Sequence, residues 1–172
     1  MLENEIKAKV RNLRRTVMRL KRLGAVKVKE ERQRDIYLNA PHKNLKETDE
    51  VLRIREGALD TLTYKGPRIR TKARAREHLE VAVSCGKTAM QILTEMGFKQ
   101  VAEIDKIRQT YKIKGLLVAL DQVRKLGTYM EIEAMAKSKG ELLKLSDRIY
   151  DLLDAIGIPR EDEEKRTYLE MT

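Results

Sequence analysis

Aromatic residues and cysteine are scarce in this chain. It has no tryptophan, one phenylalanine and a single cysteine, Cys85. One cysteine cannot form an internal disulfide, which suits a reducing compartment, and without Cys or His neighbours it does not indicate a thiolate metal site. So few aromatic side chains also leave little that could stack the bases of a single-stranded nucleic acid.

Long apolar runs are missing as well. The longest, such as GLLVAL at 115–120, are far shorter than the roughly 20 residues that span a bilayer. The charged N-terminal stretch lacks the apolar segment of a signal peptide. We therefore expect no membrane partner and a cytoplasmic location.

Charged residues, in contrast, are abundant. Among 172 residues, 37 are Lys or Arg and 27 are Asp or Glu, which gives a net charge of +10. Hydrophobic residues still make up 41%, enough for a folded core, so residues 1–172 are expected to form a single domain. The surplus of positive charge indicates an anionic partner, either a nucleic acid or a phosphate-rich small molecule.

Hydrophobic periodicity predicts three helices among a larger number of strands. The helices are expected over 12–24, 86–97 and 139–156, and each is followed or ended by a glycine. Alternating residues predict strands over 2–10, 26–38, 50–56, 60–67, 74–83 and 127–135, and two more within 102–123. Several connections are too short for crossovers, which favours antiparallel pairing and an α+β fold.

The stretch LENEIKAKV at 2–10 shows the most informative pattern. On a strand, successive side chains point to opposite faces, so its charged residues share one face and its apolar residues the other. The charged face consists of Glu3, Glu5, Lys7 and Lys9. The division recurs in later strands, where charges of one sign are grouped: Arg53 with Arg55, Lys106 with Arg108, and Glu131 with Glu133.

An antiparallel sheet with a solvated outer face is the simpler interpretation of this alternation. The rows are almost entirely ionic, however, and like charges two residues apart repel unless an opposite charge lies against them. If the strands curl into a barrel, the charged faces line one cavity and the helices pack on the apolar outside. Arg and Lys rows match phosphate oxygens, and paired carboxylates bind Mg²⁺ or Mn²⁺. The pattern therefore indicates a cavity for a polyphosphate with its metal ions.

Several motifs, taken in order, resemble one known family. Glu3-x-Glu5-x-Lys7 resembles the ExExK signature that opens the CYTH superfamily, the triphosphate tunnel enzymes. The likeness continues in QRDIYL (33–38), YKGP (64–67), IDKIRQTY (104–111), LDQVRKLGTYMEIE (120–133) and RTYLEM (166–171). RDIYL and the closing Arg-x-Tyr-Leu resemble the class IV adenylyl cyclase branch more than the thiamine triphosphatase branch. The resemblance implies an eight-stranded antiparallel β-barrel, the triphosphate tunnel, with helices packed on the outside.

The resemblance also implies roles for particular charged residues. Those implied to bind the triphosphate are Lys7, Lys9, Arg53, Arg55, Lys65, Arg76, Lys106 and Arg108. Those implied to hold Mg²⁺ or Mn²⁺ are Glu3, Glu5, Glu80, Asp121, Glu131 and Glu133. The candidates for direct participation in catalysis are Lys7, Asp121 and Glu133.

One strand departs from the family pattern. Where the family usually reads Arg-x-Glu-x-Glu, this chain has Arg76, His78 and Glu80. The simpler interpretation of His78 is a neutral imidazole with hydrogen bonds in the lumen, and the alternatives are a metal ligand or a proton shuttle. Tyr37 and Tyr168 either pack through ring and hydroxyl or contact a base or ribose.

The expected function is that of a metal-dependent enzyme acting on a triphosphate. Attack of a ribose 3′-hydroxyl on the α-phosphorus would make it an adenylyl cyclase, which the terminal motifs favour. Attack of water on the γ-phosphorus would make it a triphosphatase acting on tripolyphosphate, thiamine triphosphate or a nucleotide. A polyphosphate- or RNA-binding module without turnover is a further alternative. A nucleic acid is the less favoured partner. The sequence is compatible with a homodimer.

Overall fold

The computed structural model describes residues 1–69 and 73–172. Its strands are β1 (Leu2–Lys9), β2 (Val26–Asn39), β3 (Val51–Glu56), β4 (Thr61–Lys65), β5 (Arg74–Ala82), β6 (Lys99–Ile113), β7 (Leu116–Val123) and β8 (Gly127–Ala136). Its helices are α1 (Leu13–Arg22), α2 (Gly86–Glu95) and α3 (Lys139–Ile156), followed by two 3₁₀ turns, η1 (Arg160–Asp162) and η2 (Leu169–Met171). The strands and α-helices lie where the sequence predicted them, apart from shifts of a few residues at their ends.

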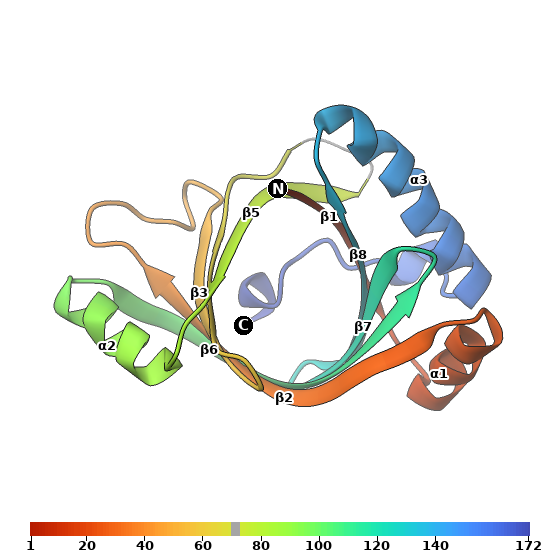
Figure 1. Cartoon of the computed structure of the whole chain (residues 1–172), viewed down its shortest axis with the longest axis horizontal. Helices are drawn as coiled ribbons and strands as arrows, with labels where there is room; N and C mark the ends of the chain where they lie inside the picture. The colour runs from red at the N-terminus through yellow and green to blue at the C-terminus, as the bar shows by residue number, and fades with distance from the viewer. Residues whose placement is uncertain (70–72) are drawn as a thin grey trace.

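These strands form one closed barrel in the order β1-β5-β4-β3-β2-β6-β7-β8, and neighbouring strands pair antiparallel (Figure 1). β1 closes the ring, because it pairs with β5 along one edge and with β8 along the other. The barrel confirms the eight-stranded antiparallel fold, with helices on the outside, that the sequence resemblance implied.

Alternation along β1 divides its side chains between the inside and the outside of the barrel. Glu3, Glu5 and Lys7 line the interior, whereas Ile6 and Ala8 are buried in the hydrophobic core on the outside. The charged row of the first strand therefore faces the interior of the barrel, as the sequence pattern predicted.

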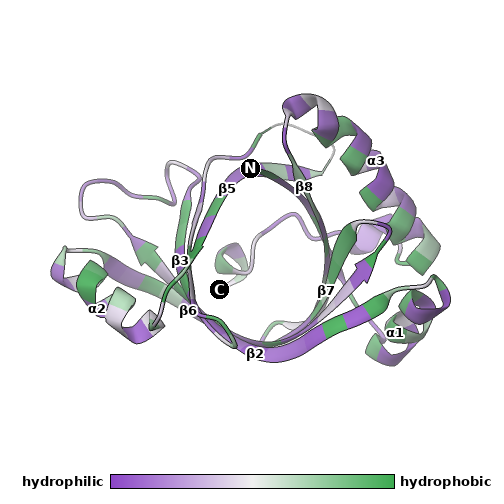
Figure 2. Ribbon diagram, in the orientation of Figure 1, coloured by the Kyte–Doolittle hydropathy of each residue, from purple (hydrophilic) through white to green (hydrophobic). Residues whose placement is uncertain are grey.

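The main hydrophobic core lies between the barrel wall and helices α1 and α3 (Figures 1 and 2). Helix α2 packs on the opposite side of the barrel. Fully buried members of this core include Ile6, Leu20, Val118, Ile132, Ile149, Leu153 and Ile156. Asn4 is buried at the same interface, where its amide nitrogen donates to Leu142 O at 2.9 Å and to Ser146 Oγ at 3.0 Å. These bonds hold α3 in register with β1. Among the described residues, none of the helices combines the length and apolar character needed to cross a bilayer.

The chain after α3 runs back across one end of the barrel. In Figure 1, which views the barrel end-on, the C-terminus lies within the ring of strands. The Glu164 amide donates to Lys7 O at 2.8 Å, and Arg74 Nη1 donates to Lys165 O at 3.2 Å. Tyr168, which is 4% exposed, reaches the barrel interior by this route. This C-terminal segment, residues 157–172, therefore narrows one end of the barrel.

Gly157→Ala is expected to destabilise the fold more than Gly24→Ala. Both glycines have a left-handed φ, +71° and +87°, where alanine costs about 1–2 kcal/mol. A Cβ at Gly157 would also collide with the guanidinium of Arg19, which donates to Ile156 O at 2.7 Å, whereas nothing lies within 4 Å of a Cβ at Gly24. Chemical denaturation should show the larger loss of unfolding free energy for Gly157→Ala. Equal losses would show that the Arg19 contact contributes nothing.

Candidate functional site

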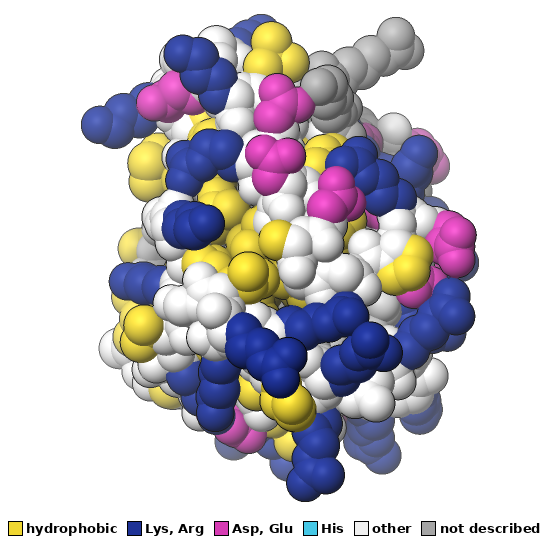
Figure 3. Space-filling view, turned by 90° about the vertical axis from the view of Figure 1, so that its right-hand side faces the viewer, with side chains coloured by type: hydrophobic (Ala, Val, Ile, Leu, Met, Phe, Trp, Pro, Cys, Tyr) yellow, Lys and Arg dark blue, Asp and Glu magenta, His cyan; other side chains and the backbone are white. Residues whose placement is uncertain are grey.

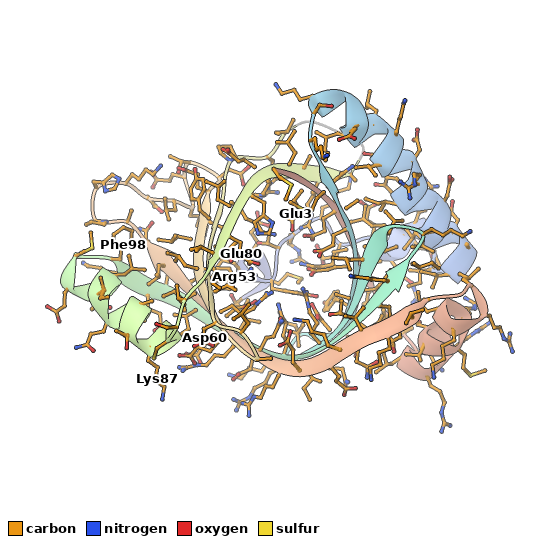
Figure 4. The ribbon with its side chains drawn as sticks, viewed as in Figure 1. Glu3, Arg53, Asp60, Glu80, Lys87 and Phe98 are labelled. Carbon is orange, nitrogen blue, oxygen red and sulfur yellow. The ribbon has the colours of Figure 1, made fainter. Side chains whose placement is uncertain are left out.

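A cavity of about 150 Å³ occupies the interior of the barrel. Glu3, Arg53 and Glu80 point into it from different strands, while Lys87 on α2 and Asp60 near the start of that helix lie outside (Figure 4). The charged residues of its lining are Glu3, Glu5, Lys7, Arg53, Arg55, Lys65, Arg74, Arg76, Glu80, Lys106, Arg108, Glu131 and Glu133. The other lining residues are Tyr37, Val51, Thr63, His78, Thr167 and Tyr168. A cavity of this size has room for several water molecules, and so for a small anion.

Three carboxylates meet on one side of this cavity. Glu5 is directly opposite Glu133 in the pairing of β1 with β8, and Glu3 lies two residues earlier on the same face. One oxygen of each carboxylate lies within 4.8 Å of the other two. Burial, followed by the charges of Glu3 and Glu5, raises the pKa of Glu133 to about 7. Hard divalent cations such as Mg²⁺ take oxygen donors of this kind, so the three-carboxylate group fits a metal ion.

His78 lies beside this three-carboxylate group. Its Nδ1 is 3.2 Å from Glu3 Oε1 and its Nε2 is 3.8 Å from Glu80 Oε2, yet neither ring nitrogen makes a well-directed hydrogen bond to a described residue. Burial acts to lower the pKa of His78, but the two carboxylates outweigh it and raise the pKa. These surroundings favour the protonated form of the ring more than water does, and the role of His78 stays a prediction. Glu80 therefore contacts His78 and stands apart from the three-carboxylate group.

Asp35, which the sequence reasoning missed, organises the basic side of the cavity. It is fully buried on β2, where it accepts from Arg55 Nε at 2.6 Å, from Lys106 Nζ at 2.8 Å and from Arg53 Nη1 at 3.4 Å. Burial acts to raise the pKa of Asp35, but the three cations hold it well below its ordinary value. Burial also lowers the pKa of Lys106, to about 8. Alternation along β2 places Asp35 on the same face as Tyr37, and this is the signal that could have found it.

Asp121 lies behind the residues that line the cavity and accepts hydrogen bonds from two of them. It accepts from Arg108 Nε at 2.7 Å and from the Tyr168 hydroxyl at 2.9 Å. Arg108 also contacts Glu131, whose Oε1 is 3.3 Å from Lys7 Nζ. Burial acts to raise the pKa of Glu131, but Lys7 and Arg108 hold it well below its ordinary value. Both acids are therefore paired with cations, as Glu3 is with Lys65 and Glu5 with Arg74, and their implied role as metal ligands stays a prediction.

Two arginines of β5 differ in what they contact. Arg74 pairs with Glu5 in the cavity, although the sequence reasoning did not single it out. Arg76, which was expected to bind triphosphate, donates to Asp49 O at 2.7 Å and to the Asp49 carboxylate at 2.9 Å. Its guanidinium thus holds a loop at the end of the barrel.

Most residues predicted from the sequence do meet in the cavity. The exceptions are Lys9, exposed at the end of β1, and Asp121, which lies behind Arg108. Thr63 and Thr167 also line the cavity, but neutral side chains gave no signal in a pattern built on charge.

The three-carboxylate group and the basic wall share one cavity. On the basic wall, Arg53 Nε is buried and has no hydrogen-bond partner within residues 1–69 and 73–172, and so is a donor available to an anion. A site of this kind can hold a divalent cation on one side and phosphate oxygens on the other. Such a site can neutralise the negative charge of a phosphoryl group and polarise its P–O bonds.

Comparisons with known proteins agree on the family and the fold. The CYTH domain family model matches residues 1–168. A Methanocaldococcus jannaschii protein named "Putative adenylate cyclase" is 36% identical over 172 residues, 99% of this chain and 98% of its own length. A solved Pyrococcus horikoshii structure is 31% identical, with a TM-score of 0.89 over 98% of this chain and 97% of that chain. A Hippeastrum structure, described as a "putative adenylyl cyclase" with a dominant triphosphatase activity, shares the fold at 16% identity and a TM-score of 0.70, over 97% of this chain and 92% of that chain.

Asp35→Asn is expected to lower the free energy of unfolding by about 3–5 kcal/mol, because it leaves buried cations without their counter-charge. Asp105→Asn on the neighbouring strand is the matched control. Asp105 pairs with the largely exposed Arg32 and Arg124, so its loss should cost about 1 kcal/mol or less. Urea denaturation of both variants measures the difference, and a similar loss for the two would contradict the organising role of Asp35.

Proposed function

This chain belongs to the CYTH domain family, and from that premise we propose that it is a metal-dependent enzyme acting on a triphosphate held inside the barrel. The observation that carries the proposal is the presence, in one cavity, of the Glu3, Glu5 and Glu133 carboxylates together with a wall of lysines and arginines. A polyphosphate bound to a divalent cation presents the complementary charges to both sides.

In this proposal, Glu3, Glu5 and Glu133 hold Mg²⁺ or Mn²⁺ through oxygen ligands. When bound, such an ion polarises a phosphoryl oxygen and orients the reacting groups. Arg53 and Lys106 bind the phosphate oxygens and neutralise the charge that develops on them. Asp35 keeps these cations in place before the substrate arrives, so little reorganisation is needed during the reaction.

We propose nucleotide cyclisation, the class IV adenylyl cyclase reaction, as the first candidate. The ribose 3′-hydroxyl of ATP attacks the α-phosphorus, the bond from that phosphorus to the bridging oxygen of pyrophosphate breaks, and cyclic AMP and pyrophosphate form. Two observations support it: the RDIYL and Arg166-x-Tyr168-Leu169 motifs, and the name of the 36% identical Methanocaldococcus jannaschii protein.

Hydrolysis is the second candidate, in which water attacks the γ-phosphorus, the bond from that phosphorus to the oxygen bridging to the β-phosphorus breaks, and orthophosphate and the diphosphate form. The dominant triphosphatase activity ascribed to the Hippeastrum protein, which shares this fold, favours it. The same charged residues serve both reactions, because each needs the phosphates held and their charge neutralised.

Product analysis by phosphorus NMR distinguishes these reactions. The pure protein is incubated separately with ATP, thiamine triphosphate and tripolyphosphate, each with Mg²⁺ or Mn²⁺. Cyclic AMP with pyrophosphate would establish the cyclase, and orthophosphate would establish the triphosphatase and rank its substrates. An absence of turnover with all three would refute the enzyme and favour a binding role.

Glu133→Gln is expected to reduce turnover by about a hundredfold or more, because it removes one of the three proposed metal ligands. Glu77→Gln, on the exposed outer face of β5, is the control and should leave turnover unchanged. Metal affinity measured by calorimetry should fall for Glu133→Gln alone. A Glu133→Gln protein that kept both turnover and metal affinity would remove Glu133 from the proposed metal site.

The affinity of the metal-free protein for tripolyphosphate is expected to fall as the pH rises through about 8, where Lys106 loses its proton. The pKa of Lys106 is lowered by burial, so its cation is present below that pH and lost above it. In Lys106→Arg the guanidinium stays charged, which separates this effect from ionisation of the ligand itself. Calorimetric titrations from about pH 7 to about pH 9 should show a steeper decline for the parent protein. Parallel profiles would contradict a role for Lys106 in binding the anion.

A further inference from the structure

A second cavity, of about 330 Å³, adjoins the one inside the barrel. Four residues line both cavities: Tyr37, Val51, Arg76 and Thr167. The second cavity lies where the loop before β3 meets the C-terminal segment, at the end of the barrel that this segment narrows. A molecule bound in the barrel could therefore extend past these shared residues into the second cavity.

The lining of the second cavity differs in chemistry from that of the first. Its apolar members include Leu38, Leu45, Leu52, Val101, Ala102 and Leu169. Acidic groups in its wall are already paired: Asp49 accepts from Arg68 Nε at 3.0 Å and from Arg76 Nη2 at 2.9 Å, and Glu50 accepts from Lys43 Nζ at 2.6 Å. The basic residue Lys46 also lines this cavity. A largely apolar space whose acidic groups are paired suits an uncharged organic group, whereas the barrel cavity suits phosphate.

A β-bulge lies in the wall of the second cavity. The pairing of β2 with β6 shifts register between Tyr37, which is opposite Ala102, and Leu38, which is opposite Gln100. Val101 is thus the extra residue of the bulge; it is 56% exposed and lines the second cavity. An extra residue is left out of the strand ladder, so its N–H and C=O can bond to another molecule. A purine or pyrimidine edge offers the matching donors and acceptors.

We propose that the second cavity binds the nucleoside portion of the substrate while the barrel binds its triphosphate. This inference rests on the proposed function, and it makes the preferred substrate a nucleoside triphosphate over inorganic tripolyphosphate. The nucleobase packs between the leucine side chains and the Val101 bulge, and the phosphates pass the shared residues to reach the basic wall.

Val101→Trp tests this assignment, because a bulky ring at an exposed position fills the second cavity without entering the barrel. Val28→Trp is the matched control, since Val28 is the extra residue of the other bulge between β2 and β6 and is 49% exposed. Binding of ATP and of tripolyphosphate is measured by calorimetry without divalent metal, so that no turnover occurs. Val101→Trp should weaken ATP binding by about tenfold or more and change tripolyphosphate binding by less than about twofold. Val28→Trp should change neither.

Methyl NMR of the parent protein supplies a second measurement that does not depend on a variant. ATP should shift the methyl signals of Leu45, Leu52 and Val101, and tripolyphosphate should leave them in place. Equal affinity for the two ligands, with no methyl shifts and no effect of Val101→Trp, would overturn the nucleoside site while leaving a triphosphate enzyme intact. Failure of both ligands to bind would overturn the proposed function and this inference together.

Discussion

Charge buried inside a closed barrel must be matched by opposite charge, and the rest of this structure depends on that condition. An ion taken out of water loses several kcal/mol of solvation, which only close, well-directed partners can restore. Asp35 meets the requirement for the basic strands by accepting from Arg53, Arg55 and Lys106. The hydrophobic core is accordingly displaced to the outside of the barrel, where α1 and α3 cover it.

Basic and acidic residues nearly balance inside the barrel, so most of the net charge of the chain lies outside it. The cavity lining together with Asp35 and Asp121 holds eight basic and seven acidic residues, so only one unit of the chain's +10 lies there and nine lie in the rest of the chain. Figure 3 shows Lys and Arg side chains gathered on the side of the molecule that carries α1 and α3. The total charge is therefore a weak guide to the ligand of the cavity. The local arrangement is the better guide, since it brings three carboxylates together and leaves Arg53 Nε without a partner among the residues that the structure describes.

Sequence reasoning found residues of the cavity where charge repeats along one strand, and it missed Asp35, where charge does not repeat. Glu3, Glu5 and Lys7 form a continuous row, so their common face was predictable from alternation alone. Asp35 is flanked on its face by Gln33 and Tyr37, and a single carboxylate in such a row gives no comparable signal. The contact of Asp121 with Arg108 was not predictable from alternation either, because the register of β6 and β7 sets the two residues opposite each other.

The sequence by itself determined which residues form strands and helices and which face of each strand is charged, because periodicity and caps are local properties of the chain. Only the tertiary structure decided which charges meet. Closing the barrel sets Glu5 opposite Glu133, from segments far apart in the sequence, and that proximity together with burial raises the pKa of Glu133. The second cavity has the same origin, since it forms where the C-terminal segment meets the loop before β3. Strand order and register are products of packing over the whole chain, and electrostatic energy depends on the distances that they set.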